Sequence, residues 1–145
     1  MLRPGRLDRL VYLGVPEDDE ERTRVLAAQI RKIKLAGDST EMARQIVSRL
    51  PKRLTGADLS TIASGALSHA IHRFCRQADE EQKLMERVRE SPVAMDQVLE
   101  GWDFEKRTPT VELDDLLRAS EEVIPSLSEK DLEHYERLRD QYTRI

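Results

Sequence analysis

Two arginines flank a Pro-Gly dipeptide near the start of the sequence, and they are the residues best suited to chemistry. Arg3 and Arg6 stand on either side of Pro4 and Gly5. Proline fixes φ and glycine tolerates a positive φ, so the dipeptide predicts a tight turn that holds both guanidinium groups on one short loop. A planar guanidinium matches phosphate oxygens bidentately, whereas lysine offers a point charge. The spacing therefore predicts a clamp for an anion, with phosphate as the best match.

A second interpretation of these arginines stays open. Together with Arg9 they crowd the first nine residues, and such a terminal stretch is also typical of a solvated tail with a frayed end. The apolar run from Leu10 to Val15 follows at once and has the character of a β-strand. A strand needs partners, so we expect the first 16 residues to be loosely held where no other strand accompanies them.

Composition indicates one helical domain. The chain has 145 residues, of which 36% are charged and 4% aromatic, with a formal net charge of -4. Burial must then rest on Leu, Ile, Val and Ala in amphipathic stripes, which favours helices. The negative charge argues against a general nucleic-acid partner, and no apolar run reaches the ~20 residues of a membrane span. Cys75 is the single cysteine, so no intramolecular disulfide and no zinc site are expected.

The spacing of apolar residues predicts the helices that would position any site. The first covers about residues 17–36, with Arg31, Lys32 and Lys34 in its last turn and Gly37 as its end. The second begins near Ser39 and must stop at Pro51. Two further helices are expected near the end of the chain, over 111–123 and from 128 to about 142.

The strongest helix signal begins at Thr55. Thr55 and Asp58 have the spacing of a capping box, and apolar residues follow at intervals of three and four up to Phe74. We expect this central helix to continue to about Glu90, because Pro92 then breaks it. Trp102 and the nearby Phe104 are expected to fold the following loop back onto the body.

Two motifs resemble the AAA ATPases. The stretch 2–8, LRPGRLD, resembles the string that carries the family's arginine fingers, and 54–59, LTGADL, resembles a string in its helical lid. The segment 123–137, with its Pro-Ser-Leu-Ser string and Tyr-Glu pair, is similar to the end of the second ATPase domain in the peroxisome-biogenesis members. The resemblance implies a mainly α fold, an AAA+ helical lid bundle of four to five helices after an arginine-finger loop and one strand. It divides the chain into 1–16 (finger loop and last strand), 17–75 (lid helices), 76–109 (an insertion) and 110–145 (C-terminal lid helices).

The resemblance also implies roles for individual residues. Arg3 and Arg6 would be catalytic arginine fingers acting in trans, on the γ-phosphate of ATP held by a neighbouring subunit. The residues implied to line the adenine and ribose are Val25, Gln29, Gly56 and Ala57, with glutamine where many relatives carry histidine. The implied cofactor is ATP, with magnesium in a full-length parent. No G-x-x-x-x-G-K-[ST] loop and no magnesium ligands occur in this sequence, so we expect the chain alone to be inactive as an ATPase.

The implied partners are neighbouring AAA subunits in a hexamer, a heterohexamer in the peroxisomal members, and the peroxisomal import machinery, with no nucleic acid and no transmembrane segment. The implied work is extraction of an import receptor from the peroxisomal membrane, by a cytosolic protein peripheral to it. A start inside the motif indicates a truncated gene model or a fragment of a longer protein. Two alternatives remain, a stand-alone helical protein-interaction module with a lid-like fold, or the lid of another AAA unfoldase of the valosin-containing or ribosome-maturation type.

Overall fold

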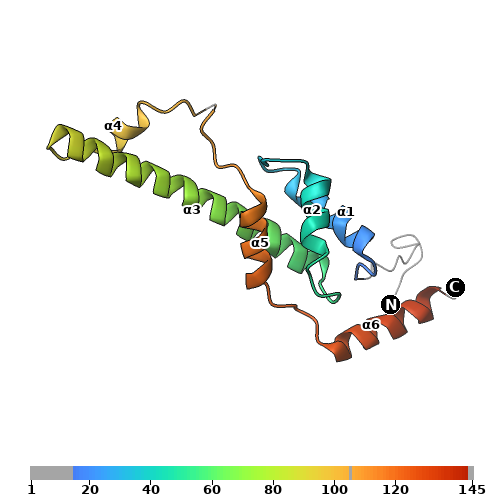
Figure 1. The fold of residues 1–145 in the computed structure, drawn as a ribbon. Helices are drawn as coiled ribbons and strands as arrows, with labels where there is room; N and C mark the ends of the chain where they lie inside the picture. The colour runs from blue at the N-terminus through green and yellow to red at the C-terminus, as the bar shows by residue number, and fades with distance from the viewer. Residues whose placement is uncertain (1–14, 105, 144–145) are drawn as a thin grey trace, which may run out of the picture.

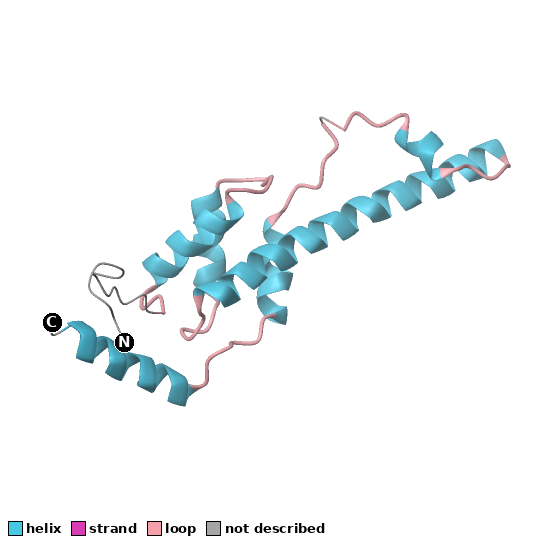
Figure 2. Cartoon of the chain, turned by 180° about the vertical axis from the view of Figure 1, so that it is seen from behind, coloured by secondary structure: helices cyan, strands magenta, loops and turns pink. Residues whose placement is uncertain are grey.

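Six helices make up the part of the chain that the computed structural model describes, residues 15–104 and 106–143. They are α1 (Asp19–Ile30), α2 (Ser39–Val47), α3 (Gly56–Arg89), α4 (Met95–Leu99), α5 (Leu113–Glu122) and α6 (Glu129–Thr143). No strand occurs among these residues (Figure 2). The predicted mainly α fold is confirmed, with one helix, α4, more than expected. The strand predicted over Leu10 to Val15 lies, apart from Val15, outside the described residues.

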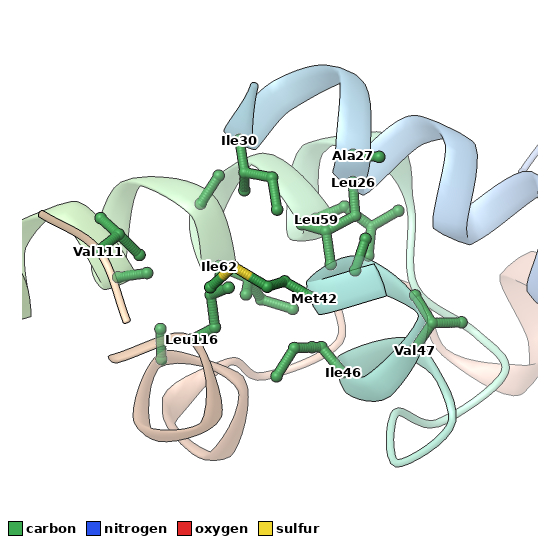
Figure 3. Close-up of a cluster of buried hydrophobic side chains, with 14 of the residues drawn as sticks. Leu26, Ala27, Ile30, Met42, Ile46, Val47, Leu59, Ile62, Val111 and Leu116 are labelled. Carbon is green, nitrogen blue, oxygen red and sulfur yellow. The ribbon is translucent and has the colours of Figure 1, made fainter. Parts of the chain in front are cut away.

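The long helix α3 is the axis of the structure. Helices α1 and α5 pack on its first half, α2 packs on α1 and α5, and α4 lies along its far half (Figure 1). The main core forms where α1, α2, α3 and α5 meet (Figure 3). Its fully buried larger side chains are Leu26, Ile30, Ile46, Val47, Leu54, Leu59, Ile62, Val111 and Leu116. The stripe predicted on the central helix forms the inner wall of this core from Leu59 to Ala70, whereas Ile71 is exposed and Phe74 packs on Trp102.

Side-chain caps fix where the helices begin. Asp18 accepts a hydrogen bond from the Glu21 amide at 2.7 Å at the start of α1, and Asp38 accepts one from the Glu41 amide at 2.9 Å at the start of α2. At α3 the predicted capping box of Thr55 and Asp58 is confirmed. Each cap satisfies amide groups that a first helical turn leaves without partners, which sets the start of the helix.

The end of α1 differs from the prediction. The helix stops at Ile30, so Arg31, Lys32 and Lys34 lie beyond it and do not complement its dipole from within the last turn. A tertiary contact prevents the helix from continuing to Gly37. The Ala36 amide donates to the Val111 carbonyl at 2.9 Å, and the Val111 amide donates to the Lys34 carbonyl at 2.8 Å. This short parallel bridge needs extended backbone, and a helix could not continue through it.

Arg73 joins the middle of α3 to the start of α5. Its guanidinium donates to Asp115 Oδ2 at 2.6 Å, to Glu112 Oε1 at 2.8 Å and to the Thr110 carbonyl at 2.9 Å. Asp115 is buried and also accepts from the Glu112 amide at 2.9 Å. The hydrogen bond to Asp115, with the charges of both acids, raises the pKa of Arg73 above its already high value in spite of partial burial.

The arm, residues 76–104 and 106–109, consists of the far half of α3 and the segment that folds back along it. The helix runs to Arg89, as predicted, and Glu90 ends it in the left-handed conformation two residues before Pro92. The predicted return of the loop is confirmed for Trp102 but not for Phe104, whose side chain is 53% exposed. Trp102 is buried, its indole Nε1 donates to Glu81 Oε2 at 2.7 Å, and its ring meets that of Phe74 edge-on at 5.0 Å.

Arg22 is a buried cation that holds the connection between α2 and α3. Its side chain is 1% exposed, donates to the Pro51 carbonyl at 3.3 Å and pairs with Asp19. Its Nε has no hydrogen-bond partner among the described atoms. A buried guanidinium that is only partly satisfied costs stability. In exchange, the hydrogen bond to Pro51 lets α1 fix the backbone a few residues before Thr55.

Close packing of α3 on α5 gives a first prediction. A Cβ at Gly65 would lie 3.1 Å from the Ala119 Cβ. We expect Gly65→Val to lower the free energy of unfolding by about 1 to 3 kcal/mol through overpacking, although valine is the better helix former. Chemical denaturation followed by circular dichroism measures this. Ser64→Val, on the exposed side of the same turn, is the matched control and should stay within about 0.5 kcal/mol. Equal effects of the two substitutions would contradict the close contact.

Candidate nucleotide-facing site

Four residues implied by resemblance to face a nucleotide come from two elements. Val25 and Gln29 stand four residues apart on α1, and therefore on one face of it, while Gly56 and Ala57 open α3. The Gln29 side-chain amide donates to the Gly56 carbonyl at 3.3 Å. Val25 is half-buried against the main core. The structure thus brings Gln29 and Gly56 into contact. Val25 lies one turn before Gln29 on α1, and Ala57 follows Gly56 on α3.

The surface at Gly56 is open. A Cβ placed on Gly56 would meet no atom within 4 Å, and Ala57 is exposed. A flat group could therefore approach the backbone of the first turn of α3 without a side chain between them. Helix α3 also points its positive dipole end toward this side. The arrangement can supply one wall of a binding site, with backbone, an amide and an aliphatic side chain as its chemistry.

A buried carboxylate holds the turn that precedes this wall. Asp58 is 5% exposed, and its Oδ2 accepts from the Thr55 amide at 2.8 Å and from the Thr55 hydroxyl at 2.9 Å. The Thr55 hydroxyl in turn accepts from the Asp58 amide at 3.1 Å. Asp58 acts as a cap, as expected, and has no reacting group beside it among the described residues. It fixes Thr55, and so the position of Gly56.

Ser126 adds a contact that the sequence did not predict. Its hydroxyl donates to the same Asp58 oxygen at 3.0 Å, and its amide does so at 3.3 Å. Burial by itself would raise the pKa of Asp58, but the hydrogen bonds from Thr55 and Ser126 outweigh it and hold the pKa below its usual value. Two features of the sequence could have indicated this contact. One is a cap carboxylate with spare acceptor capacity, and the other is the serine-rich string at 125–128.

The predicted finger residues Arg3 and Arg6 lie outside the described part of the chain. The first described residues, Val15 to Glu17, help to line a hollow of about 260 Å³ with Lys52, Leu132, Tyr135 and Arg139. Within residues 15–104 and 106–143, no group of three or more His, Cys, Asp or Glu side chains is placed to hold a metal ion. In the same residues, no helix is both long enough and apolar enough to cross a membrane.

Comparison with known proteins identifies relatives with similar sequences. No model of a protein family matches the chain. The chain is 33% identical to the peroxisomal ATPase PEX6 of Yarrowia lipolytica over 98% of its own length and 14% of that protein. It is 33% identical to PEX6 of Cricetulus griseus over 98% of the chain and 12% of the relative, and 30% identical to PEX6 of Saccharomyces cerevisiae over 96% and 13%.

A solved structure has the same fold. The crystal structure of the FIGL-1 AAA domain in complex with ADP matches 94% of this chain and 38% of that chain, with a TM-score of 0.59 and 17% identity. The chain belongs to the AAA ATPase family. It spans 12 to 14% of the length of the PEX6 proteins named above. The AAA helical lid expected from the sequence is confirmed as its fold.

The double role of Asp58 gives a second prediction. We expect Asp58→Ala to lower the free energy of unfolding by about 1 to 3 kcal/mol at pH 7, since the variant loses the cap and leaves donors unpaired. The folded-state pKa lies below the unfolded value of about 3.9, so this stability is fully present above pH ~4 and is lost as the pH falls through the folded-state pKa.

Urea denaturation of the wild type and the variant at pH 7 and at lower pH values measures the effect. The difference between the two proteins should shrink on acidification. Asp79→Ala removes an exposed carboxylate from the same helix and serves as the control, with a change within about 0.5 kcal/mol at both pH values. A gap between wild type and Asp58→Ala that is independent of pH would show that the carboxylate's charge does not support the fold.

Proposed function

We propose that the chain is the C-terminal segment of a peroxisome-biogenesis AAA ATPase, and that it supplies the adenine-facing lid and, through Arg3 and Arg6, arginine fingers in trans. The observation that carries the proposal is the similarity of 96 to 98% of the chain to PEX6 proteins from two yeasts and a mammal. The contact of Gln29 with Gly56 supports the nucleotide part, because it sets α1 beside the first turn of α3.

In this proposal, the chain and the rest of the parent protein contribute different parts of the ATP site. ATP and its magnesium are held elsewhere in the parent protein, and this segment closes over the adenine and ribose. Phosphoryl transfer spreads negative charge over the γ-phosphate oxygens, and a guanidinium delivered from the next subunit stabilises that charge. The arrangement requires a ring of subunits, which we propose to be a heterohexamer. The work done by each cycle is extraction of an import receptor from the peroxisomal membrane, by a cytosolic protein peripheral to that membrane.

A chimera tests the finger assignment, which is the third prediction. This chain replaces the matching segment of Saccharomyces cerevisiae PEX6, and the purified assembly is assayed for ATP hydrolysis and its cells for import of a peroxisomal matrix protein. Arg3→Ala and Arg6→Ala should each lower hydrolysis by about 10³-fold or more at the site they reach, since a trans arginine typically contributes ~10³ to 10⁵ in rate.

Arg9→Ala is the matched control, because it removes the same charge from the same short stretch. It should leave hydrolysis close to that of the unmodified chimera. Undiminished hydrolysis in both finger variants would overturn the assignment. An inactive chimera with an intact assembly would favour the stand-alone interaction module over the lid of a peroxisomal ATPase.

The fourth prediction concerns the lid wall. Gln29→Ala in the active chimera removes one hydrogen bond and the side chain that lies against Gly56. We expect the KM for ATP to rise about 2- to 10-fold with little change in kcat, because a contact to the base is made equally in the ground and transition states. Gln45→Ala, an exposed residue on α2, is the control. A fall in kcat with unchanged KM would contradict a role of Gln29 in binding ATP.

A further inference from the structure

One oxygen of Asp58 serves two distant parts of the chain. Two of its four donors are local, the amide and hydroxyl of Thr55. The other two, the amide and hydroxyl of Ser126, come from the connection between α5 and α6, 68 positions along the chain. The Ser126 and Thr55 hydroxyl oxygens also lie 3.3 Å apart. The connection is thus bonded to the carboxylate that also holds Thr55, the residue immediately before the open backbone at Gly56.

Helix α6 stands apart from the bundle. It packs closely against none of the other helices in the described part of the chain, and both views show it separated from α3 and α5 (Figures 1 and 2). The connection before it is largely exposed, with Ile124 at 84%. Two of the contacts that bear on its position are the Ser126 bonds to Asp58 just ahead of the helix and the ion pair of Arg139 with Glu17 farther along it.

We propose that Ser126 is a positioning residue, which couples the placement of α6 to the geometry of the first turn of α3. A charged acceptor makes strong hydrogen bonds, so a shift of the connection pulls on Asp58 and through it on Thr55. Whatever binds or moves α6 is therefore sensed at Gly56 and Ala57. The inference depends on the proposed function only in calling that turn nucleotide-facing, since the coupling itself is a property of this chain without nucleotide.

Hydrogen exchange of the full chain, read by mass spectrometry without nucleotide, tests the coupling and is the fifth prediction. Ser126→Ala should speed exchange of the amides of residues 55–58 by about 5-fold or more, since it removes one of the donors that order the turn. Ser126→Thr keeps the hydroxyl and should restore slow exchange. Ser120→Ala is the matched control, because its hydroxyl bonds only to the Leu117 carbonyl of its own helix.

A second pair of variants separates coupling from simple loss of a bond. Arg139→Ala removes the ion pair of α6 with Glu17, and should speed exchange at 55–58 in the wild type but add little in the Ser126→Ala background. Arg137→Ala is its control, since Arg137 pairs with Glu133 on α6 itself. Unchanged exchange in Ser126→Ala, no restoration by threonine, or equal effects of Arg139→Ala in both backgrounds would each overturn the proposal. An inactive chimera beside intact coupling would sink only the proposed function.

Discussion

Coverage of the apolar stripe on α3 is the constraint on which the rest of the structure depends. Leu59, Ile62 and Ala66 are fully buried in the first half of this helix. Helices α1, α2 and α5 have 12, 9 and 10 residues, and isolated helices of that length are marginal in water. They persist because each buries an apolar face against α3 or against a neighbour that does. The wall that we propose to face a nucleotide follows from this packing, since it lies where Gln29 of α1 contacts Gly56 at the start of α3.

Local pattern determined most helix starts and the whole of α3, because capping residues and 3.6-residue spacing act within one or two turns. The end of α1 could not be found this way. Ile33 continues the periodicity and does pack against the core, but from a turn, since the bridge to Val111 claims the backbone just after it. That contact joins residues about 75 positions apart, so the sequence around α1 does not reveal it. Helix α4 has five residues, too few to show a period.

The site divides in the same way. Spacing alone indicated that Asp58 caps α3, and resemblance alone singled out Gln29 and Gly56, which the structure then places in contact. Neither could show that Ser126 would share the cap carboxylate. An ionised carboxylate has about four lone-pair positions, and the local box of Thr55 uses only part of them. The two Ser126 donors bond to the same oxygen, Oδ2, that Thr55 uses. They add to the stabilisation of a charge that burial alone would disfavour.

The arm of residues 76–109 is held by different interactions from those of the bundle. Beyond Ala78 the far half of α3 is largely exposed, and its order comes from a small cluster in which Glu81 accepts both the Trp102 indole and, at 2.8 Å, the Arg107 guanidinium. Arg107 also lies 4.8 Å from the centre of the Trp102 ring. The arm is also held by hydrogen bonds of Gln82 with the Val93 carbonyl and of Lys34 with Thr108, so opening it costs these contacts as well as those of the cluster. Arg73 stands on α3 between this cluster and the main core, so its ion pairs with Asp115 and Glu112 separate the two sets of contacts along the helix.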